Sequence, residues 1–263
     1  MQIREPNEEE SSTQPLLQEV GRTYDAASSL SLEIEVSPIV TPLSYAHLKK
    51  ASKTWADAFA SDPVLRYIDN NRKQSPEVKD ATQFIMFFVM AYWKKRKVAL
   101  TVDAGASFVF CTPPKFHEGL LDRGIYWIAE LIGKIFLALT PKEERKRAAE
   151  VENRVGLAVN RSLGDRVNKM LYIDALATEP GSQGWGYGGA LLDAVGALGD
   201  VTDQAIWLKS TNEKNTGFYL AHGYTVVAEA TVGNDNPDWN GAPVIIKIMV
   251  REPRQRRQTV IAA

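Results

Sequence analysis

The feature that most constrains this chain is a loop with four glycines between an apolar segment and a helical segment. Residues 171–178 read LYIDALAT, residues 183–189 read QGWGYGG, and residues 190–195 read ALLDAV. A helix that begins after such a loop directs unpaired backbone N–H groups and the positive end of its dipole toward the loop, and this arrangement binds phosphate. Glycine permits close approach of the phosphate and positive φ angles. The segment therefore predicts a site for a phosphorylated ligand.

Two common phosphate-binding loops do not fit this segment. The Walker pattern ends in Gly-Lys-Ser/Thr, whereas this loop continues through Gly188 and Gly189 to Ala190. The dinucleotide-binding pattern has wider glycine spacing and an acidic residue about twenty positions further on. Here the next predicted strand carries Lys209 instead. The loop is therefore typical of neither a nucleotide hydrolase nor a dinucleotide-binding domain.

The remaining pattern, Q-x-x-G-x-G at residues 183–188, resembles the GNAT superfamily of acyl-CoA-dependent N-acetyltransferases. The likeness extends back through Leu176-Ala177-Thr178 and Pro180. It continues through a second segment, residues 215–224, which is similar to the family's segment that joins an asparagine to Phe-Tyr and Gly-Phe/Tyr. About eighty residues carry the resemblance. A looser likeness, in A-F-x-x-D-P-x-x-R at residues 58–66 and in the helical region 115–167, is to puromycin N-acetyltransferase-like and fungal small-molecule acetyltransferases.

The resemblance implies an α/β (α+β) GNAT fold, in which helices flank a central mixed sheet with a splayed pair of parallel strands. We expect three regions: a mostly disordered tail over 1–36 with a first strand at its end, the acetyltransferase domain over 37–252, and a basic tail over 253–263. Pro38 and Pro42 bound a predicted turn. Periodicity and turn residues predict helices over 45–59, 64–68, 76–95, 119–139, 141–157, 188–199 and 214–222, and strands over 98–102, 107–112, 171–178, 205–210, 225–232 and 244–250.

The resemblance also implies a binding site for acetyl-CoA, the co-substrate. Backbone amides of the glycine loop would hold the pyrophosphate, the edge of strand 171–178 would pair with the pantetheine arm, and Asn215 would hydrogen-bond that arm. Trp185 stands where many relatives carry a basic residue, so one phosphate contact is in doubt. The implied cofactor-binding residues are Leu176, Ala177, Thr178, Gln183, Gly184, Trp185, Gly186, Tyr187, Gly188, Gly189, Asn215 and Tyr219.

Two residues are catalytic candidates, Tyr219 and Asp174. By family resemblance Tyr219 lies near the sulfur as the acid, and a phenol with a reference pKa near 10 suits protonation of a leaving thiolate; the alternative is a core aromatic. Asp174 is unusual because it lies within an otherwise apolar strand. Period-two alternation places Tyr172, Asp174 and Leu176 on one face. Asp174 then either binds the substrate ammonium or relays its proton, or forms an ion pair with a neighbouring lysine or arginine.

Composition narrows the class of protein further. The chain has 263 residues, a net charge of −1 and one cysteine, Cys111. The charge gives no global attraction to nucleic acid or membrane, and one cysteine excludes an internal disulfide. Three scattered histidines have no metal-ligand spacing, so we expect no metal, and His222 precedes Gly223 where a helix cap is expected. The absence of a secretory signal pattern and of a long apolar run favours a cytoplasmic protein.

The sequence therefore predicts a GNAT-fold acyltransferase that transfers the acetyl group of acetyl-CoA to a primary amine of a small molecule by direct attack in a ternary complex. The expected partner is this small-molecule amine, with no nucleic acid and no membrane. Two alternatives stay open: a protein or peptide N-acetyltransferase, and a non-catalytic acyl-CoA-binding module. The oligomeric state and the acceptor's identity are not predicted.

Overall fold

The computed structural model describes residues 37–71, 75–114 and 140–254. Backbone contacts divide the chain into two units, Met1–Ser37 and Pro38–Ala263, and the described helices and strands all belong to the second unit. The predicted tail and strand within 1–36, the predicted helix 119–139, and the basic tail beyond residue 254 lie outside the described residues.

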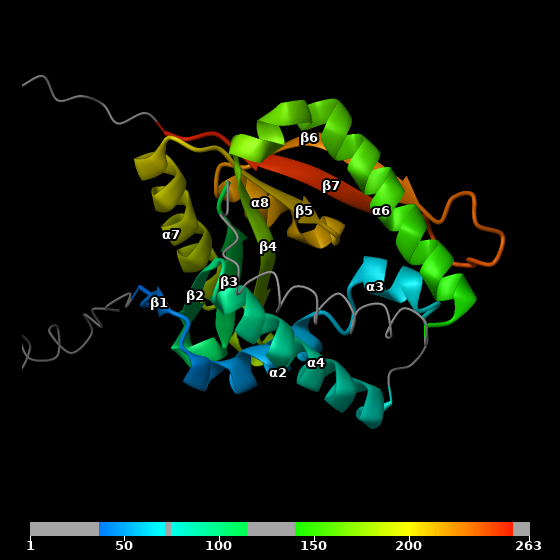
Figure 1. Ribbon diagram of the computed structural model, residues 1–263, viewed down its shortest axis with the longest axis horizontal. Coiled ribbons are helices and arrows are strands. Elements are labelled where there is room, and N and C mark those ends of the chain that lie inside the picture. The colour runs from blue at the N-terminus through cyan, green and yellow to red at the C-terminus, as the bar shows by residue number, and fades with distance from the viewer. Residues whose placement is uncertain (1–36, 72–74, 115–139, 255–263) are drawn as a thin grey trace, which may run out of the picture. The chain divides into compact units, whose positions relative to one another are not determined.

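Seven strands and six α-helices are found in the described part of the chain (Figure 1). The strands are β1 (Thr41–Pro42), β2 (Val98–Val102), β3 (Ser107–Thr112), β4 (Leu171–Thr178), β5 (Ile206–Ser210), β6 (Thr225–Val232) and β7 (Val244–Arg251). The helices are α2 (Leu48–Ala58), α3 (Pro63–Ile68), α4 (Pro76–Lys94), α6 (Lys142–Leu163), α7 (Tyr187–Thr202) and α8 (Thr216–Ala221). Short 3-10 turns, among them η1 (Tyr45–His47) and η5 (Glu213–Asn215), extend α2 and α8 at their starts.

All seven strands form one sheet in the order β1-β2-β3-β4-β5-β7-β6. Only β4 and β5 are parallel, and every other pair is antiparallel. This confirms the predicted mixed sheet with one parallel pair flanked by helices. The predicted turn at Pro38–Pro42 is wrong in part, because Thr41 and Pro42 pair with β2 as a short edge strand. An edge strand tolerates proline, which removes one hydrogen-bond donor.

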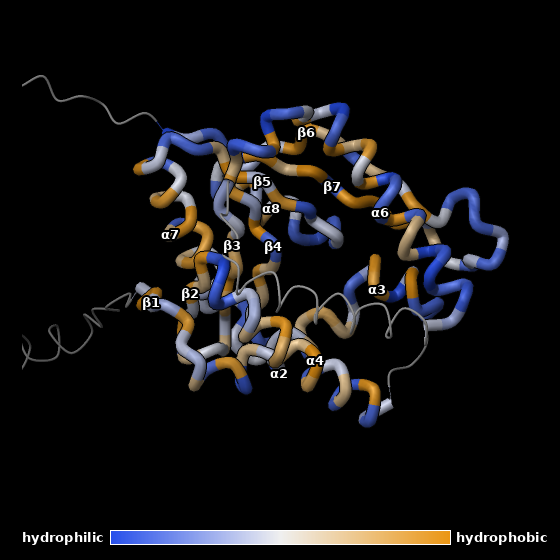
Figure 2. Tube along the Cα trace, viewed as in Figure 1, coloured by the Kyte–Doolittle hydropathy of each residue, from blue (hydrophilic) through white to orange (hydrophobic). Residues whose placement is uncertain are grey.

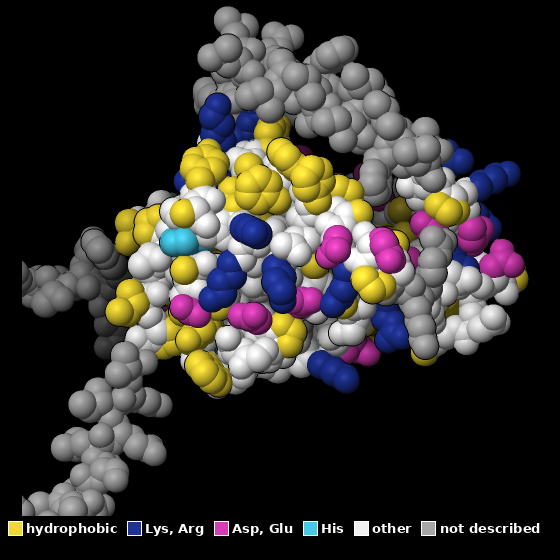
Figure 3. Space-filling model, turned by 90° about the horizontal axis from the view of Figure 1, so that it is seen from below, with side chains coloured by type: hydrophobic (Ala, Val, Ile, Leu, Met, Phe, Trp, Pro, Cys, Tyr) yellow, Lys and Arg dark blue, Asp and Glu magenta, His cyan; other side chains and the backbone are white. Residues whose placement is uncertain are grey.

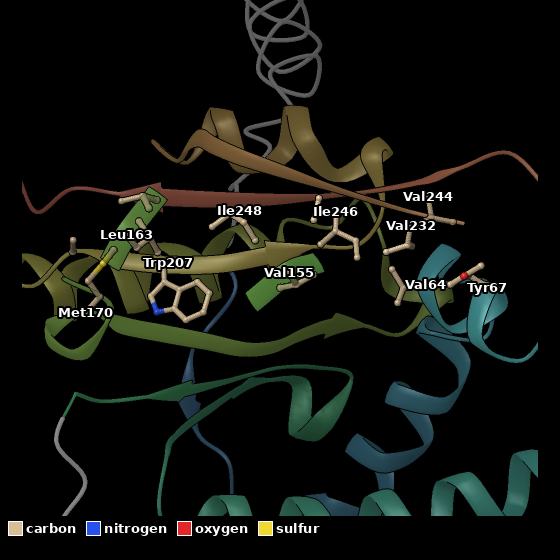
Figure 4. Close-up of a cluster of buried hydrophobic side chains, with 13 residues drawn as sticks. Val64, Tyr67, Val155, Leu163, Met170, Trp207, Val232, Val244, Ile246 and Ile248 are labelled. Atoms are coloured by element: carbon tan, nitrogen blue, oxygen red, sulfur yellow. The ribbon is translucent and has the colours of Figure 1, made fainter. Parts of the chain in front are cut away.

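Helices cover both faces of the sheet (Figure 1). Leu191, Leu192 and Val195 of α7 pack against the apolar side chains of β3, β4 and β5 on one face. On the other face, α2 and α4 cover β3 and the end of β4. The helices α3 and α6 cover β5, β7 and β6 there, and Figure 4 shows Val155 of α6 close to this group of strand side chains. The helical cover of this second face is therefore split between two groups of helices.

The helix α6 continues six residues beyond its predicted end at Leu157, because Ala158, Val159 and Leu163 still pack into the core that α3 and α6 form with β5, β6 and β7.

A buried arginine fixes α6 in place. Arg147 has no exposed surface and donates hydrogen bonds to the Tyr67 carbonyl oxygen (2.9 Å) and the Asp238 carbonyl oxygen (2.9 Å). It thereby joins α6 to α3 and to the β6–β7 loop.

A β-bulge at Asp174 changes the direction of β4. Ala175 pairs with Phe110 and Ile173 pairs with Cys111, so Asp174 is the extra residue. A bulge breaks the period-two alternation of side chains and increases the local twist. The prediction that Tyr172, Asp174 and Leu176 share one face is therefore wrong. Tyr172 packs with the α6 core, whereas Leu176 packs with the α7 core on the opposite face.

The parallel pair separates just before this bulge. The pairing of β4 with β5 extends only from Leu171 to Ile173 on β4, although both strands continue. Beyond Ile173 the edge of β4 that faces β5 has no strand beside it among the described residues. The splayed pair implied by the resemblance is thus present.

Hydropathy along the chain agrees with this arrangement. In Figure 2 the strand β7 is largely hydrophobic, whereas the β6–β7 loop is hydrophilic. Figure 3 views the molecule from the side of α2 and α4 and shows acidic and basic side chains interspersed in one band. On this face the opposite charges therefore offset each other. Within the described residues, every helix is too short or too polar to cross a bilayer.

Candidate active site

A cavity of about 1080 Å³ lies where β4 and β5 separate. Its walls come from β4, β5, the glycine loop and α8, and also from α2, α3 and α6. Eleven of the twelve implied cofactor-binding residues line it, and Asp174 lines it too. The exception is Trp185, whose side chain is 65% exposed and lies outside the cavity lining. The structure thus brings together two sequence segments, the glycine loop and residues 215–219, that are about thirty positions apart.

The glycine loop needs glycine for its backbone conformation. Gly184 has a φ of +86° and Gly186, the N-cap residue of α7, has a φ of +76°. These angles are costly for residues with a Cβ atom. The loop therefore presents the first N–H groups of a sixteen-residue helix to the cavity, together with the positive end of its dipole.

The start of α7 also packs closely against α8. A Cβ atom on Gly189 would lie 3.0 Å from Cε1 of His222, which is too close without movement. His222 occupies the C-cap position of α8, as predicted, and its Nδ1 lies 3.0 Å from Oδ1 of Asp193. Its role is thus to join α8 to α7, which fixes both segments of the cavity relative to each other.

The end of β4 is held from the β3 side and by the loop. Ser107 Oγ donates a hydrogen bond to the Ala177 carbonyl oxygen (3.0 Å), and Gln183 Nε2 donates one to the Thr178 carbonyl oxygen (3.3 Å). The Gln183 side chain therefore holds the glycine loop against β4. Within the described residues, the β4 edge that faces the cavity is not paired with another strand beyond Ile173.

Tyr219 lies on α8 and lines the cavity, as does the implied pantetheine ligand Asn215 at the N-cap of the same helix. Its ring meets Phe218 and Tyr224 at centroid distances of 5.3 and 5.9 Å. Burial raises the pKa of the Tyr219 phenol to about 12. The phenol is therefore protonated at neutral pH, and it is a weaker acid than the reference phenol. Its neighbour Tyr224 lies outside the cavity lining, and the hydroxyl group of Tyr224 is buried without a hydrogen-bond partner among the described residues.

Asp174 forms the ion pair that the sequence left as one of two alternatives. Its Oδ1 lies 2.5 Å from Nζ of Lys97, and its Oδ2 accepts a hydrogen bond of 2.6 Å from Thr112 Oγ1. The Lys97 and Asp174 side chains are only 16% and 12% exposed. Asp174 nevertheless lines the cavity, so the ion pair does not remove it from the site, and its role toward the acceptor stays a prediction.

Sequence reasoning missed Lys97, Thr112 and Trp207. Lys97 reaches Asp174 from just before the start of β2, and Thr112 reaches it from the end of β3. The only sequence signal was that Lys97 directly precedes one predicted strand and Thr112 ends the other. Trp207 lines the cavity and stacks on Tyr172 with a centroid distance of 4.2 Å. These two rings form an aromatic wall on the α6 side of the cavity.

Several other aromatic and titratable side chains lie outside the lining of the cavity or outside the described residues. Phe108 and Phe110 are fully buried in the core between α2, α4 and the sheet. Tyr67 is bonded to Glu150, and Trp239 packs edge-on against Tyr67, so neither lines the cavity. His117 and Trp127 lie outside the described residues. Burial raises the pKa of the Cys111 thiol to about 12, which makes it a poor nucleophile. Within the described ranges no three His, Cys, Asp or Glu side chains are grouped to hold a metal ion.

Comparison with known proteins finds solved structures that share this architecture. No protein-family model matches the sequence, and no curated protein matches it significantly. Solved structures do match. Arylalkylamine N-acetyltransferase 2 from Aedes aegypti is 12% identical with a TM-score of 0.55, over 82% of this chain and 99% of that one. A mosquito arylalkylamine N-acetyltransferase like 5b is 15% identical with a TM-score of 0.51, over 82% of this chain and all of that one (100%).

The chain therefore shares the fold of these two N-acetyltransferases, as its sequence resemblance to N-acetyltransferases implied. The match covers 99% and 100% of those two chains, so the likeness extends over their whole fold.

Proposed function

We propose that this protein is an N-acetyltransferase that transfers the acetyl group of acetyl-CoA to a primary amine of a small molecule. One observation carries the proposal: a single cavity joins the glycine loop at the start of α7, the unpaired edge of β4 and the phenol of Tyr219. A phosphate site, a strand edge and a proton donor are the three features that this reaction uses.

Acetyl-CoA fits the donor half of the cavity. The N–H groups between Gly184 and Gly189 would hold the pyrophosphate, because the helix dipole and several unpaired donors converge there. The edge of β4 from Leu176 to Thr178 would form main-chain hydrogen bonds to the pantetheine amides, as an added strand does. The Asn215 side chain is exposed and forms no cap hydrogen bond, so it is free to bind the same arm.

The chemistry is a direct transfer within a ternary complex. The lone pair of the neutral amine attacks the thioester carbonyl carbon, a C–N bond forms, and the C–S bond breaks. The amine loses one proton, and the departing thiolate gains one. Tyr219 would donate a hydrogen bond and then a proton to the sulfur, and solvent returns that proton to the phenol. A backbone N–H group of β4 would polarise the carbonyl oxygen.

Asp174 would act on the acceptor side. Each of its oxygens has one partner, Lys97 or Thr112, and an ionised carboxylate has further lone pairs to accept hydrogen bonds. We expect it to bind the substrate ammonium or to relay its proton through water. The ion pair with Lys97 positions the carboxylate at the bulge, and this positioning is compatible with either role.

The walls of the acceptor half favour a small, partly apolar amine. Val151, Val155 and Trp207 line it from α6 and β5, and the cavity is of a size typical of small-molecule sites. Two structural matches with a TM-score above 0.5 are named arylalkylamine N-acetyltransferases, which agrees with an apolar body on the amine. The alternatives are a protein or peptide acceptor and a module that only binds acyl-CoA.

A thiol-release assay with acetyl-CoA separates these alternatives. The purified chain would be tested against a panel of small primary amines and against a panel of lysine-containing and free-N-terminus peptides, and acetyl-CoA binding would be measured by calorimetry. We expect release with small amines. Release only with peptides would favour the protein acetyltransferase, and binding without release would favour the module.

A further inference from the structure

An exposed lysine occupies the middle of the sheet. Lys209 lies on β5, an interior strand between β4 and β7, and its neighbours Leu208 and Ser210 are buried. Lys209 is exposed because β4 leaves β5 after Ile173, one position before Lys209 in the pairing register. Its side chain lines the cavity. The splay of the parallel pair therefore places one ammonium group inside the acceptor half.

This ammonium has no acidic partner among the described residues. Asp174, the carboxylate at the same level of β4, is held by Lys97 and Thr112. Asp62, which also lines the cavity, accepts hydrogen bonds from the N-terminus of α3 and from Thr211. Glu152 lines the cavity from α6 and is exposed, with no ion pair to Lys209. The carboxylates that line the cavity are thus already engaged or lie apart from Lys209.

The lysine lies beside the aromatic wall. Its Nζ is 5.3 Å from the centroid of the Tyr172 ring, which stacks on Trp207. Burial raises the pKa of the Tyr172 phenol, and the Lys209 ammonium lowers it through its charge and through a hydrogen bond to the phenol oxygen. The phenol therefore stays neutral and can donate a hydrogen bond to the same group that Lys209 attracts. A cation and a neutral hydroxyl donor next to flat apolar surface form a site for an anionic group attached to an apolar body.

We propose that Lys209 binds a carboxylate on the acceptor, so that the acceptor is an amine that also carries a carboxylate, as an amino acid does. This inference rests on the proposed function and narrows its substrate class. A carboxylate fits better than a phosphate, because one lysine supplies one charge and no arginine is among the described residues that line the cavity.

Matched acceptor pairs that differ only in the carboxylate test this proposal. The probes are tyrosine and tyramine, tryptophan and tryptamine, and arginine and agmatine, each measured with saturating acetyl-CoA in the wild-type chain, Lys209→Met and Lys209→Arg. Lys214→Met is the matched control, because Lys214 is an exposed lysine on the next turn that does not line the cavity. Binding of the products N-acetyltyrosine and N-acetyltyramine by calorimetry gives a second readout that does not depend on turnover.

We expect kcat/KM to favour the carboxylated member of at least one pair. Lys209→Met should lower this preference by roughly 10- to 100-fold, the effect of one charged hydrogen bond. Lys209→Arg should restore most of it, Lys214→Met should leave it unchanged, and product binding should follow the same order.

Two results would overturn the assignment while leaving the proposed function intact. One is turnover only with the decarboxylated amines at a rate that Lys209→Met does not alter. The other is a loss of acetyl-CoA affinity in Lys209→Met, which would assign the lysine to the donor. Thiol release with no amine of either kind would contradict the proposed function itself.

Discussion

Nζ of Lys97 lies 2.5 Å from Oδ1 of Asp174, and this pair joins the start of β2 to the bulge in β4. Both side chains are largely withdrawn from water, and the Lys97 ammonium also lies 4.4 Å from the centroid of the Trp93 ring. A buried pair of this kind loses stability mainly when one partner is removed, because the other charge is left uncompensated. The site therefore includes a charge pair that stabilises the strand geometry on which the cavity depends.

Removal of either partner should destabilise the chain. Lys97→Met and Asp174→Asn should each lower the free energy of unfolding by about 3 kcal/mol, and the double variant Lys97→Met/Asp174→Asn should lower it by less than the sum. Urea unfolding followed by circular dichroism measures this. Additive losses in the double variant would mean that the two side chains do not interact.

The same variants separate structure from catalysis. Asp174→Asn should depress turnover strongly and leave acetyl-CoA affinity unchanged, because the carboxylate faces the acceptor half. Lys97→Met retains the carboxylate and should lose less turnover than Asp174→Asn at equal folded fraction. Equal losses in both variants would make the pair a purely structural element, and unchanged turnover in Asp174→Asn would exclude its catalytic role.

Alanine at Gly186 should weaken the phosphate site. A φ of +76° costs a residue with a Cβ atom about 1–2 kcal/mol, which the loop relieves by moving its N–H groups. We expect acetyl-CoA affinity to fall about 10-fold, measured by calorimetry. Gly181→Ala is the control, since Gly181 has an ordinary φ and open space where its Cβ would lie. Equal losses of acetyl-CoA affinity in Gly186→Ala and Gly181→Ala would contradict a requirement for the positive φ angle at Gly186.

Phenylalanine at position 219 should remove the proton donor. Tyr219→Phe should lower kcat by about 10²- to 10³-fold with little change in acetyl-CoA affinity. Tyr224→Phe is a matched control on the adjacent ring: it deletes a buried hydroxyl group that has no partner among the described residues, so activity should persist and stability should hold or rise. A fully active Tyr219→Phe variant would leave Tyr219 as a core aromatic only.

The pH profile of kcat/KM should show no decline near pH 10 that is due to ionisation of Tyr219. Burial raises the pKa of this phenol to about 12, so the protonated donor persists as pH rises past the ordinary value and is lost only near pH 12. Deprotonation of the amine should therefore make kcat/KM rise with pH and then level off up to about pH 11. A decline with a midpoint near 10 that disappears in Tyr219→Phe would show that the phenol titrates normally in the enzyme.

Much of this fold is readable from local patterns. The strands β2, β3, β4 and β6 have their predicted bounds because alternating apolar residues and turn residues delimit them. The glycine loop is equally predictable from the sequence, since Gly184 and Gly186 occupy positions with a positive φ angle, which favours glycine. The helix α6 continues past its predicted end at Leu157, because the apolar residues that follow pack into the core between α6 and the sheet.

The acceptor half of the cavity could not be predicted from local sequence patterns. Whether Asp174 shares a face of β4 with Tyr172 or with Leu176 depends on one bulge, and this bulge arises from how β3 and β4 pair. Lys97 and Thr112 meet Asp174 from 77 and 62 positions away, and no spacing in the sequence indicates such contacts. The stack of Tyr172 on Trp207 likewise depends on the parallel register.

The most direct test of the proposed activity couples the two products of one reaction. The purified chain would be incubated with acetyl-CoA and an amine panel that includes tyrosine and tyramine, with free CoA thiol measured by a chromogenic reagent and the acetylated amine by mass spectrometry. We predict equal amounts of thiol and N-acetylated amine, both lost together in Tyr219→Phe. Acetyl-CoA binding with neither product, or thiol release without an acetylated amine, would contradict an acetyltransferase.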